Sequence, residues 1–413
     1  MSVYRVGRRR FLQAGGISLS TGALAAAAAV GIPEPLRAAE RAAKPVRIRA
    51  VDIFPIEVPT PAEEVQAGKI NRYPVVRVET DVGVRGYSFA GGPAQLLDRQ
   101  IRPMLVGQDL FAIEQHLKAG LVQFGGVEHA LWDAIGKIAG QPVYRLLGGS
   151  KSAVKVYLTC VWPGKADQSH ISYKQQADIA VKIKNAGFKG MKIRAWRPNP
   201  ADDADACGEI RAAVGPDFAI MVDRTAQMPG VVWDYNTGLR VARALEKHNA
   251  TWLEEPFHRD DFLSPARLAR EVDITITGGE GFRGLDGFRE CLVHGTYDIL
   301  QPDCVGAGGI FTVRKIAAMA EAFHKPTIMH GAMGLRLAGW LQTSAAIGSP
   351  WQELALVTPP LLPEEQWSPA LKVVNGDRLF TFRDGEIQVP QGPGLGLDIN
   401  EDALERYRVP PRM

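Results

Sequence analysis

Ionisable residues recur at regular intervals over the second half of the chain, each next to a short apolar run of the kind that forms buried parallel strands. Successive positions in this series are 23 to 31 residues apart: Lys192 (with Arg194), Asp223, Glu254, Glu280, Asp303, His330 and Glu353. The carboxyl ends of parallel strands meet at one face of a barrel, where functional side chains gather. The spacing therefore predicts one cluster of reactive groups.

Three acids of this series, Asp223, Glu254 and Glu280, follow adjacent predicted strands. Carboxylate oxygens without His or Cys suit Mg²⁺, with Mn²⁺ as a substitute. Each acid taken singly could instead pair with a lysine or cap a helix. Because all three are in register, we predict a metal site.

Two cations and a histidine complete the predicted cluster. Lys192 and Arg194 are two residues apart on one strand and so face the same way. They could hold a substrate carboxylate and the charge that grows on it, or simply neutralise the acids. His330 follows a buried strand, and Asp303, one strand earlier, could hold an imidazole nitrogen and raise its basicity.

The elements that must position these groups alternate between strands and helices, which predicts a (β/α) barrel, with a doubly wound open sheet as the alternative. The predicted strands are Val156–Cys160, Gly190–Arg194, Ala219–Asp223, Thr251–Glu254, Ile274–Thr277, Ile299–Gln301, Thr327–His330 and Leu354–Val357. Prolines between Thr358 and Pro363 exclude a regular eighth helix there.

Residues 45–150 have a mixed pattern that predicts a separate α+β domain. Strand-like stretches at Arg47–Ile53 and Val75–Val84, the second turning at 81–83, precede a helical pattern from Val127 to Ile138 that Gly140 ends. We assign the barrel to residues 151–370. The tail, residues 371–413, alternates like strands from Val373 to Val389 and is expected to return to the first domain.

Residues 1–43 have the pattern of an export signal. The sequence Arg8-Arg9-Arg10-Phe11-Leu12-Gln13 precedes an uncharged run rich in Ala and Gly, which matches a twin-arginine signal. A single membrane anchor is the alternative, but the glycines and hydroxyl residues of the run suit hydrocarbon poorly. We predict cleavage between Leu36 and Ala43, no stable membrane insertion afterwards, and a periplasmic protein exported in its folded state.

Charge and cysteine content exclude several classes of protein. The chain of 413 residues has a formal charge of +3, of which the signal carries +4, so the remainder is close to −1 and shows no basic stripe for nucleic acid. Its four cysteines include no Cys-x-x-Cys pair, which excludes a disulfide scaffold and a structural zinc site. We expect free buried thiols, with Cys160 and Cys304 on strands and Cys207 and Cys291 on helices.

Several motifs together resemble the enolase superfamily, and within it the mandelate racemase group. They are Trp252-Leu253-Glu254-Glu255-Pro256, Gly278-Gly279-Glu280, Gln301-Pro302-Asp303 with Gly308-Gly309, Met329-His330-Gly331, and Glu128-His129-Ala130-Leu131-Trp132-Asp133 with Pro142 and Leu146-Leu147-Gly148-Gly149. The resemblance covers about Pro45 to Val409. It implies a capping domain over a (β/α)₇β barrel, consistent with the missing eighth helix.

The resemblance also implies roles for the cluster. Mg²⁺ would bind Asp223, Glu254 and Glu280, Asp303 and His330 would form a dyad, and Glu353 would hydrogen-bond a developing enolate. The segment from Thr60 to Tyr73 resembles the specificity loop of the family, so Lys69, Arg72 and Tyr73 are candidate substrate contacts. The expected partner is a small-molecule carboxylate, and the expected assembly is a homo-oligomer.

Two departures from the family pattern narrow the expected reaction. The racemases have Lys-x-Lys where this chain has Lys192-Ile193-Arg194, and Thr225 stands where Asn is common. Arginine stays protonated and is a poor base, which leaves His330 as the one good base. We therefore expect dehydration of a sugar acid to a 2-keto-3-deoxy acid, with a 2-hydroxy-acid racemase or epimerase and a non-catalytic exported binding protein as alternatives.

Overall fold

The computed structural model describes residues 44–60, 71–225 and 232–410. The predicted export signal, residues 1–43, and the candidate contact Lys69 lie outside the described residues. The chain divides into a first unit, Met1–Pro45, and a second unit, Val46–Met413, and every described helix and strand belongs to the second. None of the described helices is both long and apolar enough to cross a membrane.

Eight parallel strands form the barrel, in the order β10-β11-β4-β5-β6-β7-β8-β9. Their bounds are β4 (Ala153–Cys160), β5 (Gly190–Arg194), β6 (Ala219–Asp223), β7 (Trp252–Glu254), β8 (Thr275–Gly278), β9 (Ile299–Leu300), β10 (Met329–Ala332) and β11 (Gln352–Val357). The ring closes because the Ile328 amide donates to the Leu300 carbonyl at 3.0 Å, and the His330 amide to the Pro302 carbonyl at 3.1 Å. The predicted barrel is confirmed, and the open-sheet alternative is wrong.

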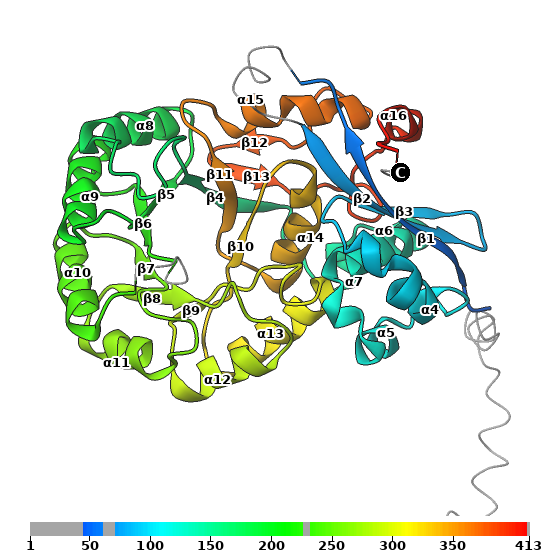
Figure 1. Cartoon of the computed structure of the whole chain (residues 1–413), viewed down its shortest axis with the longest axis horizontal. Helices are drawn as coiled ribbons and strands as arrows, with labels where there is room; N and C mark the ends of the chain where they lie inside the picture. The colour runs from blue at the N-terminus through cyan, green and yellow to red at the C-terminus, as the bar shows by residue number, and fades with distance from the viewer. Residues whose placement is uncertain (1–43, 61–70, 226–231, 411–413) are drawn as a thin grey trace, which may run out of the picture. The chain divides into compact units, whose positions relative to one another are not determined.

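Helices cover the outside of this ring (Figure 1). They are α8 (Tyr173–Asn185), α9 (Ala201–Val214), α10 (Tyr235–Lys247), α11 (Leu263–Glu271), α12 (Asp286–His294), α13 (Ile310–Ala322), and α14 (Leu337–Ile347) behind the short 3₁₀ turn η4 (Gly334–Arg336). Helix α10 shows why such segments are helical. Asp234 caps it by accepting the Thr237 amide at 2.7 Å, and Val241, Ala242 and Leu245 form its buried face.

The position of an eighth helix is filled by a short substitute. After β11 the chain forms only α15 (Pro363–Trp367) and the 3₁₀ helix η5 (Ser368–Val373). Helix α15 begins at Pro363, where the missing amide hydrogen costs no helical bond. The described residues after β11 therefore lack a regular eighth helix, as expected from the prolines, and the (β/α)₇β architecture implied by the resemblance is present.

An antiparallel sheet of β1 (Ile48–Glu57), β2 (Arg72–Thr80) and β3 (Arg85–Ser88) forms the cap. Helix α6 (Gly125–Ala139) packs on it so closely that a Cβ at Gly86 would lie 2.1 Å from the Ala130 carbonyl oxygen. Gly140 ends α6 in the left-handed conformation, as predicted. The remaining cap elements are η1 (Ala94–Leu96), η2 (Leu97–Ile101), α4 (Arg102–Leu105), α5 (Ile113–Ala119), η3 (Leu121–Gln123) and α7 (Val143–Leu146).

The tail divides between the two parts of the fold, which corrects one expectation. Its strands β12 (Phe382–Arg383) and β13 (Glu386–Gln388) form a hairpin that pairs with β4 of the barrel and not with the cap sheet. Helix α16 (Glu401–Arg406) follows, and the Glu57 amide at the end of β1 donates to the Tyr407 carbonyl at 2.9 Å. Alternation predicted strands in this segment but carried no information about their partner.

Candidate active site

The strands bring all the residues of the predicted series to one region of the barrel. Lys192 and Arg194 are on β5, Asp223 and Glu254 are the last residues of β6 and β7, and strand register places Arg194 beside Asp223 and Asp223 beside Glu254. Two placements differ from the prediction. His330 and Glu353 are the second residues of β10 and β11, because β10 continues to Ala332 and β11 begins at Gln352, two residues before the predicted start.

Lys192 lies at the centre of the cluster and is completely buried. Its Nζ is 2.8 Å from Glu254 Oε2, 2.9 Å from Glu353 Oε1 and 3.4 Å from Asp223 Oδ2. Burial lowers the pKa of Lys192, but the charges of Glu254 and Glu353 outweigh burial and raise the pKa well above its ordinary value. Lys192 is therefore a fixed cation and not a base in this arrangement.

Arg194 is the second fixed cation. Its guanidinium forms an ion pair with Asp223 and donates to Thr225 Oγ1 at 2.6 Å, while the Trp196 ring lies 5.1 Å away. Burial lowers the pKa of Arg194, but the charge of Asp223 contributes to a net rise above its ordinary value. Thr225 thus binds both partners of this pair, since its hydroxyl also donates to Asp223 Oδ1 at 2.6 Å.

His330 connects two acids through its two ring nitrogens. Nδ1 is 3.0 Å from Asp303 Oδ2, and Nε2 is 2.9 Å from Glu280 Oε2. The amides of Val305 and Gly306 donate to Asp303 Oδ1 and so orient this carboxylate. Burial lowers the pKa of His330, but the charge of Glu280 and the hydrogen bond to Asp303 raise it well above its ordinary value, which favours the imidazolium.

Glu353 is a buried carboxylate that is held by several donors. It accepts from the Gly331 amide at 2.9 Å, from Tyr157 Oη at 3.3 Å and from Thr159 Oγ1, besides its ion pair with Lys192. Burial raises the pKa of Glu353, but Lys192 and the other partners outweigh this and bring it to about 2. The side chain is thus ionised here, and it must take up a proton before it can donate to an enolate.

Carboxyl groups outnumber the basic groups in the cluster. Burial, followed by the charge of Asp223, raises the pKa of Glu254 to about 8. Six carboxyl groups meet three permanent cations and one imidazole: Asp223, Glu254, Glu255, Glu280, Asp303 and Glu353 against Lys192, Arg194, Arg259 and His330. A divalent cation would relieve this excess, and oxygen ligands of this kind suit Mg²⁺.

The three predicted metal ligands are each paired with a cation of the protein. Arg194 binds Asp223, Lys192 binds Glu254, and both Arg259 and His330 bind Glu280. Consequently, the described residues contain no group of three His, Cys, Asp or Glu side chains already arranged around one ion position. The donor set fits a divalent cation if these side-chain contacts rearrange.

Several residues of the cluster were not found from the sequence. Arg259 Nε donates to Glu255 Oε2 at 2.8 Å, and its guanidinium also pairs with Glu280. Glu255 follows Glu254 directly, so strand alternation would turn it away, but its φ of 44° breaks the alternation. The Gln301 amide donates to Glu254 Oε2 at 3.1 Å. Loop residues such as Arg259 have no periodic pattern that marks them.

The candidate substrate contacts Arg72 and Tyr73 line a cavity of about 420 Å³ between the cap and the barrel loops. The cavity is bounded on the barrel side by Met333 and Thr358, which follow β10 and β11.

The four cysteines are buried free thiols, as predicted, although Cys304 lies in a turn after β9 and not on a strand.

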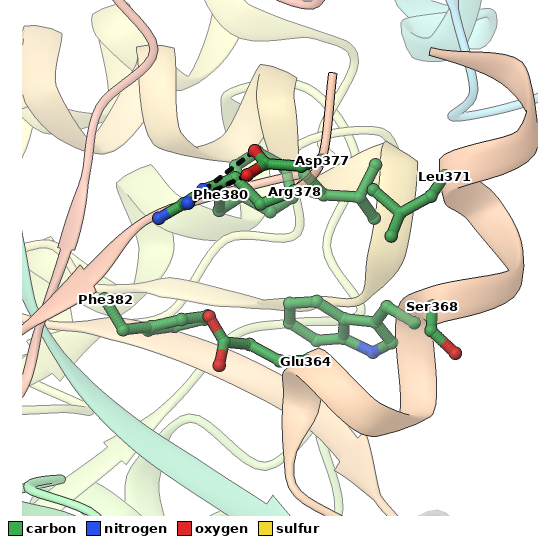
Figure 2. A pocket seen from close by; sticks show the side chains of 9 residues that line it. Glu364, Ser368, Leu371, Asp377, Arg378, Phe380 and Phe382 are labelled. Carbon is green, nitrogen blue, oxygen red and sulfur yellow. Dashed lines mark hydrogen bonds and ion pairs between the residues drawn. The ribbon is translucent and has the colours of Figure 1, made fainter. Parts of the chain in front are cut away.

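A second cavity, of about 360 Å³, lies beside α15 and η5 and contains none of the predicted site residues (Figure 2). Phe380, Phe382 and Leu371 form its apolar lining, and the Asp377–Arg378 ion pair stands at one side. Because no group of the cluster reaches it, we do not place the reaction there.

The family described as "Enolase C-terminal domain-like" matches residues 175–403, and "Mandelate racemase / muconate lactonizing enzyme, N-terminal domain" matches residues 57–148. Arabinonate dehydratase of Saccharolobus solfataricus is 32% identical over 80% of this chain and 89% of its own. The 3,6-anhydro-alpha-L-galactonate cycloisomerase of Streptomyces coelicolor is 30% identical over 69% and 82%, respectively.

A solved structure resembles the fold over nearly its whole length. The L-talarate dehydratase of a Polaromonas species, complexed with Mg and L-glucarate, aligns with a TM-score of 0.70 and 27% identity, covering 88% of this chain and 98% of its own. Both family matches coincide with the cap and the barrel that carry the cluster. The chain belongs to the mandelate racemase/muconate lactonizing enzyme family of the enolase superfamily.

Proposed function

We propose that this protein is a Mg²⁺-dependent hydro-lyase that removes the α-proton of a sugar acid and dehydrates it to a 2-keto-3-deoxy acid. The observation that carries the proposal is the Asp303–His330 pair beside the acids that end β6 and β7 and follow β8. A base next to a metal-binding set is what abstraction of a weakly acidic α-proton requires. The dehydratase and cycloisomerase relatives support this reaction class.

Asp223, Glu254 and Glu280 would hold the ion. When bound, Mg²⁺ would withdraw charge from the substrate carboxylate and so lower the free energy of the enediolate. Lys192 and Arg194 are fixed cations that would hold the same carboxylate as its second negative charge develops. Glu353, once protonated from solvent, would donate a hydrogen bond to the enediolate.

His330 would act twice in the elimination. With Glu280 engaged by the cation and no longer paired with Nε2, the neutral imidazole would take the α-proton through Nε2, while Asp303 holds Nδ1. The electron pair of the broken C–H bond forms the enediolate, and its collapse makes the Cα–Cβ double bond and breaks the Cβ–O bond. The imidazolium returns its proton to the departing hydroxyl, which leaves as water, and the enol product tautomerises to the 2-keto acid.

Racemisation or epimerisation is the second candidate, since one curated relative is a cycloisomerase. Such a reaction needs a second base on the opposite face of the α-carbon. Arg194 occupies the position of that base, and its ion pair with Asp223 favours the protonated guanidinium. We therefore propose the one-base dehydration ahead of a two-base reaction.

The test is a screen of sugar acids with Mg²⁺, read as 2-keto product and repeated in D₂O. We expect keto product from wild-type protein and loss of at least about 10²-fold with His330→Asn. His294→Asn, which changes an exposed histidine of α12, is the matched control. Deuterium in recovered substrate with both configurations formed would indicate the racemase. Absence of both product and exchange would indicate a non-catalytic binding protein.

We also propose that residues 1–43 direct export of the folded protein by the twin-arginine route to the periplasm. The supporting feature is the arginine pair ahead of Phe11 and Leu12. Replacing Arg8 and Arg9 by Lys in a tagged protein should abolish its periplasmic appearance, and unchanged export would overturn the proposal.

We propose in addition that the enzyme is a homo-oligomer. Large apolar side chains are exposed on or next to successive barrel helices, at Leu263, Val293 and Phe323, which supports a contact between copies. Light scattering of the purified protein should give a mass that is a multiple of the protomer mass, and a monomer would contradict the proposal.

A further inference from the structure

The cavity between the cap and the barrel loops lies at the end of the barrel that holds the reacting groups. Met333 follows His330 by three residues, and Thr358 follows Glu353 by five, both in the direction of their strands. At the rise of an extended strand, Met333 is about 10 Å beyond His330. A sugar acid that reacts at His330 can therefore extend its far end into this cavity.

The charge of the cavity is unlike that of the reaction site. Its described lining includes two arginines, Arg72 and Arg336, and no Asp or Glu. Neither guanidinium forms an ion pair with a carboxylate of the described residues, although Glu57 is the strand neighbour of Arg72. A cavity whose described lining has two available cations and no acid is a candidate site for an anion.

Arg336 is held in position by its surroundings. It is the last residue of η4, and its guanidinium carbon is 5.3 Å from the centre of the Trp340 ring. The positive charge of Arg336 also affects the pKa of Asp303 in the reaction site. Burial raises the pKa of Asp303, but the hydrogen bond with His330, with Arg336 as a smaller contributor, lowers it below its ordinary value. Arg336 therefore lies within electrostatic range of the reaction centre.

We propose that this cavity binds a second carboxylate, at the end of the substrate far from the reacting carbon, so that the preferred substrates are sugar diacids. This inference rests on the proposed function. Lys192 and Arg194 hold the carboxylate next to the reacting carbon, and Arg72 and Arg336 hold the distal one. A guanidinium matches a carboxylate with two parallel hydrogen bonds, whereas the terminal hydroxymethyl group of a monoacid offers no charge.

The remaining polar side chains of the cavity suit the chain between the two carboxylates. Thr358 and Gln366 carry hydroxyl and amide side chains that can bind sugar hydroxyls. The side-chain oxygen Oε1 of Gln366 accepts a hydrogen bond from the Thr358 backbone amide at 2.8 Å, which orients this side chain. The relatives do not decide between the substrate classes. One is named for arabinonate, a monoacid, and one solved structure contains L-glucarate, a diacid.

The test compares diacids with monoacids of the same configuration, glucarate with gluconate and galactarate with galactonate. Each is assayed with Mg²⁺ and the protein without residues 1–43. We expect at least one diacid to exceed its monoacid partner by 10-fold or more in kcat/KM. Arg336→Gln and Arg72→Gln should each reduce that ratio about 10- to 100-fold. Arg336→Lys, which keeps the charge, should lose less than Arg336→Gln.

Arg378→Gln is the matched control, because Arg378 is an exposed arginine of the second cavity, beside α15 and η5. It should leave the ratio of diacid to monoacid within 2-fold of wild type. Thermal unfolding of each variant separates a local loss of binding from a failure to fold. A variant that loses activity on both acids equally would contradict a distal-carboxylate role.

The outcomes separate this inference from the proposed function. Dehydration of monoacids at rates equal to those of diacids would overturn the inference and leave the hydro-lyase assignment intact. If neither class is dehydrated, the proposed function fails, and calorimetric binding of glucarate and gluconate to the Mg²⁺-loaded protein decides the inference. Tighter binding of glucarate that is lost in Arg336→Gln would support it, and equal binding would overturn it.

Discussion

The carboxylate of Glu128, on cap helix α6, accepts the amide of Ile310 at the start of barrel helix α13 at 2.8 Å. It also accepts the Phe311 amide at 2.9 Å and the Trp132 indole at 2.8 Å. One buried side chain thus caps a barrel helix and fastens the cap to it.

This contact predicts a pH-dependent stability difference. Burial raises the pKa of Glu128 to about 7, although its three donors lower it. The folded state therefore binds more protons than the unfolded state between about pH 4.5 and 7. The contribution of Glu128 to stability should fall as the pH rises through this window.

Urea unfolding of wild type and Glu128→Gln at pH 5 and at pH 7.5 tests this prediction. Gln keeps the shape but loses one acceptor, so wild type should be more stable at pH 5 by about 1–3 kcal/mol. We expect this advantage to shrink at pH 7.5. A stability difference between wild type and Glu128→Gln that grows with pH would show that the hydrogen bonds from the amides lower the pKa of Glu128 more than burial raises it.

Lys192 should be important for stability as well as for chemistry. Lys192→Met leaves three buried acids without their shared cation, which should cost about 3–5 kcal/mol in the absence of Mg²⁺. Added Mg²⁺ should recover part of this loss, because a ligand that binds only the folded state stabilises it. Urea midpoints with and without Mg²⁺ measure both effects. Lys174→Met, at an exposed lysine of α8, should change stability by no more than about 0.5 kcal/mol.

Asp303→Asn tests whether Asp303 orients His330. The amide retains the shape but removes the charge that holds Nδ1, so kcat should fall about 10²- to 10⁴-fold while the fold is kept. Steady-state kinetics and circular dichroism are the measurements. Asp286→Asn, at an exposed acid of α12, is the control and should be neutral. Near-normal turnover by Asp303→Asn would remove the dyad from the mechanism.

Gly86 should tolerate no side chain. A Cβ there would lie 2.1 Å from the Ala130 carbonyl oxygen and 2.7 Å from the Ala134 amide, so Gly86→Val must separate β3 from α6. We expect a loss of at least about 1–3 kcal/mol in thermal or urea unfolding. Gly83→Asn is the comparison, because its added Cβ meets no atom within 4 Å and Asn accepts its φ of +81°. Equal stability of the two variants would contradict the close packing.

The sequence predicted those parts of the fold and site that follow from local periodicity. Strand-sized apolar runs identified the eight barrel strands, and the residues at the ends of β6 and β7, Asp223 and Glu254, follow from them directly. Features that depend on distant partners could not be predicted. Local alternation predicts strands in the hairpin β12–β13, but no local sequence feature indicates that the hairpin pairs with β4.

Loop residues of the site could not be predicted from the sequence for a related reason. Arg259 and Arg336 stand outside regular strands, where no period marks the direction of a side chain. Each contributes through charge brought near by the tertiary fold, Arg259 to Glu280 and Arg336 to the cavity under the cap. The positions of these two arginines follow only from the three-dimensional structure.

The bond between the Glu57 amide and the Tyr407 carbonyl has a consequence for synthesis. In sequence order Glu57 precedes every barrel strand, whereas Tyr407 follows them all. The barrel strands can therefore all be synthesised before this contact forms, and the roof over the reacting groups is completed after the ring. The nascent protein passes through a stage with a complete ring of strands and an unfinished roof, and a chain that lacks Tyr407 would stay at that stage.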